Sequence, residues 1–194
     1  MIALAGAEIV GALRVAELRP GDVLLYRGRS LFSLAIRLVT ASVYTHVEAF
    51  DGVDADGAPM AWASRDGIGV GRYPFRRAGL ALALRPRRPF NVEAARAFWQ
   101  AANGEPYDWP GLAVSRLPIL QGRSGDERAQ FCSEAMARAC RHGFGAALDP
   151  PVRAGDRRAL AIRGADPFNG APAEAIHPGA FAWCPLFEAW EVRV

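Results

Sequence analysis

The stretch Ala129-Gln130-Phe131-Cys132-Ser133-Glu134-Ala135-Met136-Ala137-Arg138-Ala139-Cys140 decides how the rest of the chain is interpreted. It is rich in good helix formers, follows a polar loop at 122–128, and is expected to end at Gly143. Cys132 then lies in the first helical turn, where unpaired N–H groups and the helix dipole favour a thiolate. The same N–H groups can hold an oxyanion. Cys132 is therefore a candidate nucleophile, although a buried structural thiol is the commoner fate of a free cysteine.

The bulk composition indicates a folded globular protein. The chain has 194 residues, enough for a single domain over residues 1–194, and 51% of them are hydrophobic. The formal net charge is +3 and the pI is about 9. Every basic residue apart from histidine is an arginine, and the arginines are scattered in short groups. We therefore expect solvated surface charge and no nucleic-acid partner.

The three cysteines, Cys132, Cys140 and Cys184, are an odd number, and no Cys/His spacing typical of a zinc site occurs. This pattern favours a reducing compartment or a catalytic thiol over a disulfide scaffold. It also predicts no metal and no other cofactor.

The N-terminal segment 1–13 is mildly apolar but lacks a basic region and carries Glu8, so it is a poor signal peptide. No run of residues approaches the length of a transmembrane helix. We expect a cytoplasmic protein, or one that a phage or other machinery delivers to the cell envelope.

The order of expected elements predicts an α+β domain with a mostly antiparallel sheet. Asn91 is a suitable N-cap for one of its helices, and Leu34 lies on the apolar face of another. In chain order we expect a strand at 23–26, a helix at 31–39, strands at 44–50, 60–64, 68–73 and 80–84, a helix at 92–102, a short helix at 112–120, the Cys132 helix, and a helix or strand at 181–194.

A thiol nucleophile needs a base, and the sequence offers three histidines. His142 lies at the far end of the Cys132 helix, roughly 15 Å away at 1.5 Å per residue. His177 precedes a proline in a loop and has no evident chemistry around it. His46 lies inside a hydrophobic strand, where histidine is costly unless it has a partner or a function. His46 is the candidate base, and a core histidine with satisfied hydrogen bonds is the alternative.

The base in turn needs an orienting group. On a strand, His46 and Glu48 share one face, so Glu48 is the first candidate. Their backbone positions are roughly 6.5–7 Å apart, and their side chains must lean together to meet. Ser64, on the next expected strand, is the weaker alternative.

Several motifs in a fixed order resemble those of a known family. They are Pro20-Gly21-Asp22-Val23-Leu24-Leu25, Tyr44-Thr45-His46-Val47, Gly104-Glu105-Pro106-Tyr107-Asp108-Trp109, Phe131-Cys132-Ser133-Glu134 and Pro178-Gly179-Ala180-Phe181. Together they resemble the circularly permuted branch of the NlpC-type papain-like cysteine hydrolases, which includes the bacterial YiiX-like proteins and is related to lecithin:retinol acyltransferase. The resemblance covers roughly residues 15 to 190. It implies a papain-like fold in which an antiparallel sheet packs against helices that carry the nucleophile.

The resemblance implies that Cys132 is the nucleophile and His46 the general base. Two positions depart from the family pattern. Glu48 stands where the family usually has a small residue, and Trp62 stands where a glutamate often precedes alanine on the next strand. The usual orienting acid is therefore missing, and Glu48 is its candidate replacement. Tyr107 resembles a family residue near the cleft, although core packing is the commoner role of such aromatic residues.

Three functions follow from these features. The first is a cysteine hydrolase that cleaves an amide or peptide bond through an acyl-thioester, with a murein peptide or another acyl-amide as substrate. The second is a lipid amide or ester hydrolase or acyltransferase, which the apolar residues Trp62, Trp109 and Phe131 favour. The third is a catalytically inactive binding or structural module on the same fold, motivated by the missing family glutamate. The sequence does not predict an oligomeric state.

Overall fold

The computed structural model describes residues 9–30, 33–34, 36–37, 42–108, 130–145 and 176–193. Its centre is a seven-stranded sheet with the order β1-β7-β6-β2-β3-β4-β5. The strands are β1 (Ile9–Arg14), β2 (Val23–Tyr26), β3 (His46–Val53), β4 (Pro59–Arg65), β5 (Gly69–Pro74), β6 (Leu80–Pro86) and β7 (Phe187–Arg193). Neighbouring strands are antiparallel except β1 and β7, which are parallel. The expected α+β class and mostly antiparallel sheet are confirmed.

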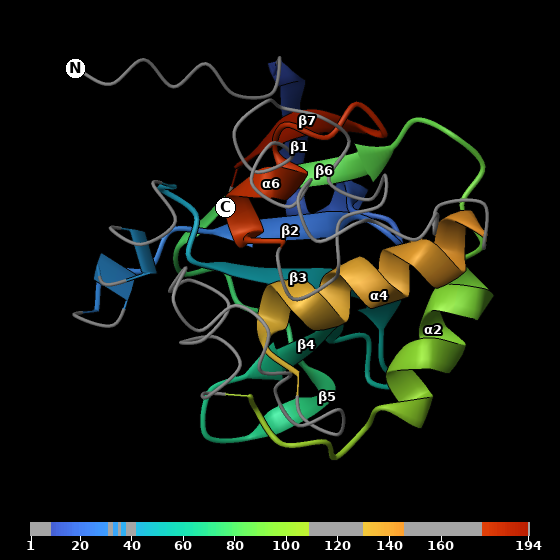
Figure 1. Cartoon of the computed structure of the whole chain (residues 1–194). Coiled ribbons are helices and arrows are strands. Elements are labelled where there is room, and N and C mark those ends of the chain that lie inside the picture. Colours follow the sequence, from blue (N-terminus) through green and yellow to red (C-terminus); the bar gives the residue numbers. More distant parts are fainter. Residues whose placement is uncertain are drawn as a thin grey trace, which may run out of the picture.

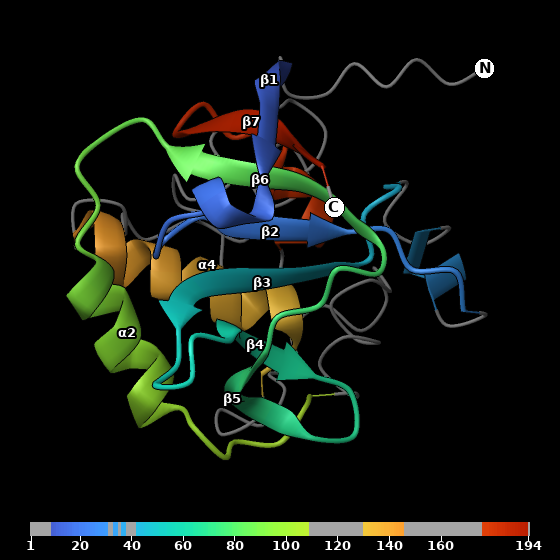
Figure 2. The same cartoon turned by 180° about the vertical axis from the view of Figure 1, so that it is seen from behind.

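The helices that carry the site lie on one face of this sheet. Helix α4 (Cys132–Phe144) crosses the strands with α2 (Val92–Ala101) beside it (Figure 1). From the opposite side the strands lie in front of α4, and α2 lies beside the sheet (Figure 2). Two short helices, η1 (Val15–Glu17) and α6 (Pro178–Phe181), complete the described elements. The site therefore forms where α4 meets the sheet.

Strand β2 is buried on both faces. Val23 and Leu25 join the cluster beneath the helices, which includes Met136 of α4. Leu24 and Tyr26 belong to a second cluster on the other face. This alternation follows from the two-residue period of a strand, and it accounts for the continuous apolar run in the sequence.

Helix α2 begins as the sequence predicts. The Asn91 side chain accepts a hydrogen bond from the Ala94 N–H at 3.0 Å, as an N-cap residue does. The Asn91 N–H also donates to the Gly143 carbonyl at 2.7 Å, which ties the start of α2 to the end of α4.

The predicted end of α4 at Gly143 is wrong. The helix continues to Phe144 and ends at Gly145, whose φ of +86° suits glycine. Gly143 is buried where the helix passes Phe90, and a Cβ atom at this position would overlap the Phe90 ring. The glycine at 143 therefore permits a close approach instead of stopping the helix.

Other expectations differ in smaller ways. Leu34, predicted to face the core, is 46% exposed. The rest of the 31–39 helix's predicted apolar face lies outside the described residues, as do the predicted helix 112–120 and the loop 122–128. In the segment 181–194, predicted as a helix or a strand, Phe187–Arg193 form the strand β7, and the helix α6 ends at Phe181. Strand β1 is an additional strand that the sequence did not indicate.

Gly143→Ala should lower the free energy of unfolding by about 1–3 kcal/mol, because the added methyl group meets the Phe90 ring in a packed core. Urea unfolding of this variant and of Gly143→Ala combined with Phe90→Leu measures the effect. The smaller leucine side chain in the double variant should recover part of the loss. Strictly additive losses in the double variant would contradict this explanation.

Candidate active site

The start of α4 lies where two strands of the sheet stop pairing. Strands β3 and β4 are paired from Ala49 opposite Trp62 to Val53 opposite Pro59. Among the described residues, the two strands form no pair nearer the start of β3. There the Ser64 hydroxyl donates to the Gln130 carbonyl, and the Val47 N–H hydrogen-bonds the Cys132 sulfur. Ser64, the weaker candidate for orienting His46, thus holds the segment that enters α4.

The three residues predicted to form the site come together. Cys132 is the first residue of α4 and His46 the first residue of β3. The His46 ring hydrogen-bonds the Cys132 sulfur, and its Nε2 atom lies 3.1 Å from Oε1 of Glu48. Because Nε2 faces the carboxylate, Nδ1 is the ring nitrogen left for the thiol. The side chains of His46 and Glu48 do lean together, as contact at this spacing requires.

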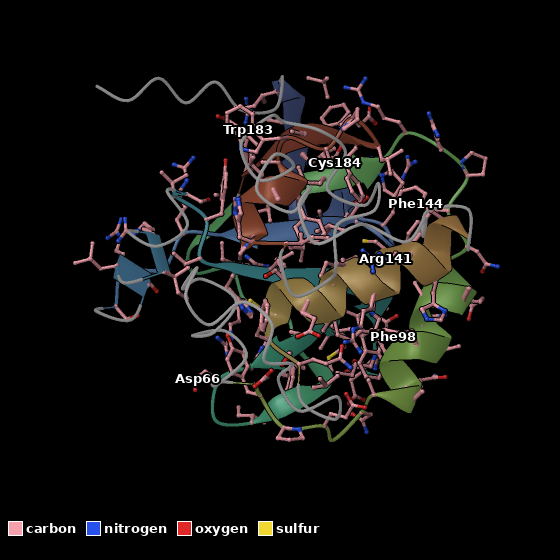
Figure 3. The ribbon with its side chains drawn as sticks, in the orientation of Figure 1. Asp66, Phe98, Arg141, Phe144, Trp183 and Cys184 are labelled. Atoms are coloured by element: carbon pink, nitrogen blue, oxygen red, sulfur yellow. The ribbon has the colours of Figure 1, made fainter. Side chains whose placement is uncertain are left out.

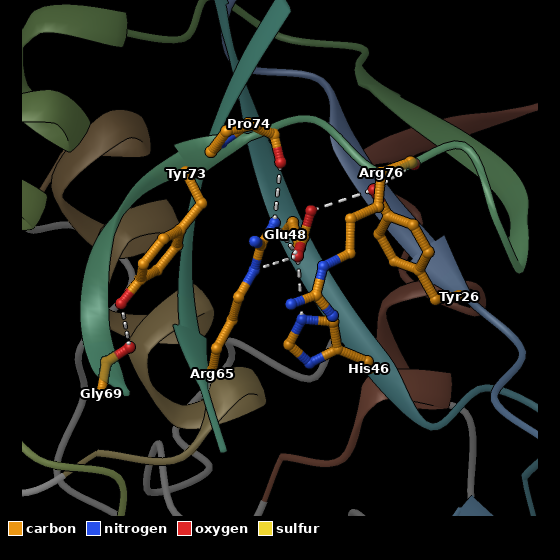
Figure 4. Close-up of polar contacts among 8 residues, drawn as sticks. All are labelled: Tyr26, His46, Glu48, Arg65, Gly69, Tyr73, Pro74 and Arg76. Atoms are coloured by element: carbon orange, nitrogen blue, oxygen red, sulfur yellow. Dashed lines mark hydrogen bonds and ion pairs between the residues drawn. The ribbon is translucent and has the colours of Figure 1, made fainter. Parts of the chain in front are cut away.

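Glu48 is fully buried, and its charge is compensated by three neighbours. The Tyr26 hydroxyl donates to Oε2 at 3.0 Å. Arg65 approaches Oε1 with Nε at 2.9 Å and Nη2 at 2.8 Å (Figure 4). Burial alone would raise the pKa of Glu48, but the hydrogen bond and charge of His46 and the charge of Arg65 hold it below the ordinary value. Glu48 is therefore ionised at neutral pH.

Arg65 is itself held in place. Its side chain is buried, its guanidinium lies 4.5 Å from the centre of the Tyr73 ring, and its Nη2 atom donates to the Pro74 carbonyl at 3.1 Å (Figure 4). Neither Arg65 nor Tyr26 was predicted from the sequence to belong to the site. The available signal was chemical: a carboxylate predicted inside a sheet needs a cation and a donor on neighbouring strands.

The thiol and the imidazole stabilise each other's charged form. Burial alone would lower the pKa of His46, but the charge of Cys132 and hydrogen bonds to Cys132 and Glu48 raise it to about 9. Burial alone would raise the pKa of Cys132, but the His46 charge and the N–H groups of Val47 and Ser133 lower it overall. The lowered pKa of Cys132 and the raised pKa of His46 both favour a thiolate–imidazolium pair.

Tyr107 contacts Cys132. Its hydroxyl hydrogen-bonds Cys132, and burial together with the nearby thiolate raises the pKa of Tyr107 well above the ordinary value. The hydroxyl therefore stays protonated and can donate a hydrogen bond. Core packing, the commoner role of such a residue, does not account for this contact. Trp109, which follows it in the motif, lies outside the described residues.

The remaining thiols and His142 lie apart from this pair. Cys140 is buried in α4, and burial raises its pKa. Cys184 is buried just after α6 (Figure 3). His142 stacks on Phe98 of α2, with ring centres 5.2 Å apart. Cys132 is the thiol that hydrogen-bonds His46.

Two apolar residues expected near a cleft belong to the core instead. Trp62 stacks on Trp99 at 6.3 Å between ring centres, and Phe131 is fully buried. A cavity of about 340 Å³ lies beside the site, and His46 and Tyr107 are part of its wall. Most side chains in that wall carry polar groups.

No protein-family model matches the chain, and no curated protein matches it. Among solved structures it is similar to the metalloprotein YiiX, of DUF1105, from Escherichia coli O157:H7. The TM-score is 0.57 at 19% identity, over 88% of this chain and 95% of the YiiX chain. The fold is YiiX-like.

Two observations concern the chain itself and not YiiX. Among the described residues, no group of three His, Cys, Asp or Glu side chains could hold a metal ion. None of the helices in that part of the chain is long and apolar enough to cross a membrane.

Glu48→Gln should lower the free energy of unfolding by about 3–5 kcal/mol, because it keeps the side-chain size but leaves the buried Arg65 cation without its anion. Urea unfolding measures this loss. The matched control is Glu93→Gln, which removes an exposed carboxylate paired with Arg96 and should cost less than about 1 kcal/mol. Equal losses in the two variants would contradict the role given to the Glu48 charge.

Proposed function

We propose that the protein is a cysteine hydrolase that cleaves an amide or peptide bond through an acyl-thioester intermediate. The observation that carries the proposal is the hydrogen-bonded series Cys132–His46–Glu48 at the start of a helix. It provides a nucleophile, a base and an orienting carboxylate in the geometry that such chemistry needs.

In the first half-reaction the Cys132 thiolate attacks the carbonyl carbon of the amide. N–H groups in the first turn of α4 and the protonated Tyr107 hydroxyl are available to the negative charge that develops on the carbonyl oxygen. The His46 imidazolium then gives its proton to the leaving nitrogen as the C–N bond breaks. The products of this step are a free amine and a thioester on Cys132.

In the second half-reaction a water molecule attacks the thioester and gives a proton to His46. The C–S bond breaks, the acid leaves, and Cys132 returns as a thiolate beside the imidazolium. Glu48 stays ionised throughout and holds the ring, with Arg65 and Tyr26 fixing the carboxylate. The net reaction is the hydrolysis of one amide to one acid and one amine.

The substrate we propose is a peptide amide, with murein stem peptides as the first candidates. The charged and hydroxyl side chains in the cavity wall beside His46 offer hydrogen-bond partners to the polar groups of a peptide. The apolar residues Trp62 and Phe131, which favoured a lipid substrate, are packed in the core. Glu48 fills the role of the missing family glutamate, which was the motive for an inactive module.

Alkylation by iodoacetamide should follow a Cys132 pKa well below the usual value of about 8.5. His46→Ala should move that pKa upward, because the cation that stabilises the thiolate is lost. Mass spectrometry of digested protein measures each thiol separately, and the buried Cys140 in the same helix serves as an unreactive internal control. An ordinary thiol titration that His46→Ala leaves unchanged would reject the ion pair.

Hydrolysis of murein peptides, followed by amine release, should show a bell-shaped dependence of kcat/KM on pH. The rate rises as Cys132 loses its proton below the ordinary thiol pKa, and it falls near pH 9 as His46 loses the proton that the leaving group needs. Cys132→Ser and His46→Ala should each abolish the reaction. Amine release that persists in either variant would rule out the proposed mechanism.

A further inference from the structure

The cavity beside the site has a size and a position that suit a part of the substrate. Its volume of about 340 Å³ falls in the range of small-ligand pockets. Two of its wall residues, His46 and Tyr107, hydrogen-bond the Cys132 sulfur. A group bound in the cavity would therefore lie next to the bond that the thiolate attacks.

The charges in the cavity wall leave a net positive charge. The wall contains three arginines and one aspartate: Arg27, Arg65, Arg76 and Asp66. The Arg65 charge is matched by the buried Glu48 carboxylate. Arg27 lies 5.4 Å from the centre of the Tyr44 ring, and in the described part of the chain neither Arg27 nor Arg76 forms an ion pair.

Arg76 belongs to the cavity wall, and its charge also acts on a residue of the site. Its charge lowers the pKa of Tyr26, although burial and Glu48 leave that pKa raised overall, so its guanidinium acts on the same hydroxyl that donates to Glu48. Figure 4 shows its side chain in the group around Glu48 and His46. Both unpaired arginines are exposed and reach the cavity from loops that flank β2 and β6.

We propose that this cavity binds a carboxylate of the peptide substrate, held by Arg27 and Arg76 next to the scissile amide. This proposal rests on the proposed hydrolase function, and it makes Arg27 and Arg76 determinants of substrate specificity. The planar guanidinium fork matches a carboxylate in shape. Two arginines offset by Asp66 leave one net positive charge, which matches a singly charged carboxylate better than a doubly charged phosphate.

Two alkylating probes of nearly equal size test the proposal without a known substrate. Iodoacetate and iodoacetamide transfer the same carbon to the Cys132 sulfur and release iodide, but only iodoacetate carries a carboxylate. Arg27→Gln and Arg76→Gln should each lower the ratio of the iodoacetate rate to the iodoacetamide rate at Cys132 by about tenfold, as expected for a charge-assisted hydrogen bond.

The matched controls are Arg29→Gln and Arg77→Gln. Each removes the same charge from an exposed position beside a wall residue, and neither residue contributes to the described cavity wall. Both controls should keep the wild-type ratio. A ratio that is unchanged in Arg27→Gln and Arg76→Gln, or that falls equally in the controls, would overturn the proposal.

A protection experiment distinguishes the two kinds of anion. At equal ionic strength, acetate should slow the iodoacetate reaction of the wild type more than inorganic phosphate does, and Arg76→Gln should remove the difference. Stronger protection by phosphate would overturn the assignment to a carboxylate. Iodoacetamide is uncharged, so its reaction rate reports the Cys132 thiolate and not the anion site. If the iodoacetamide rate follows an ordinary thiol titration, the hydrolase proposal fails, whereas the anion site is tested by the iodoacetate rates.

Discussion

The ionised carboxylate of Glu48, fully buried within the sheet, is the constraint on which the site depends. A buried charge is tolerated only with close partners, and here they come from three neighbouring strands. Tyr26 lies on β2, His46 on β3 and Arg65 on β4. The same contacts that neutralise the charge fix the orientation of the imidazole. Stability and chemistry are therefore linked through one side chain.

The second constraint is the separation of β3 from β4 beside this carboxylate. Because the strands stop pairing at Ala49 and Trp62, the backbone around Val47 and Ser64 is available to the segment that enters α4. The sheet thus positions Cys132, and the helix supplies only part of the hydrogen bonding to its sulfur. Val47 contributes an N–H to the sulfur from the sheet side, while Ser133 contributes one from the helix side.

The sequence predicted those features that depend on local pattern. A cysteine at a helix start and a histidine and a glutamate on the same face of one strand can all be recognised from spacing. The strand was predicted to start at residue 44, but it starts at His46 itself. Arg65 and Tyr26 could not be found from spacing, because their contacts with Glu48 depend on the register between neighbouring strands. Gly143 was misread because glycine marks both helix ends and close contacts, and only the position of Phe90 separates the two.

The measurement that tests this account most directly is a titration of the His46 imidazole by nuclear magnetic resonance, in the wild type and in Cys132→Ala. His46 is expected to stay protonated to about pH 9 in the wild type and to titrate markedly lower without the thiolate. A wild-type His46 that titrates near the ordinary value of about 6.5, unaffected by Cys132→Ala, would contradict the thiolate–imidazolium pair.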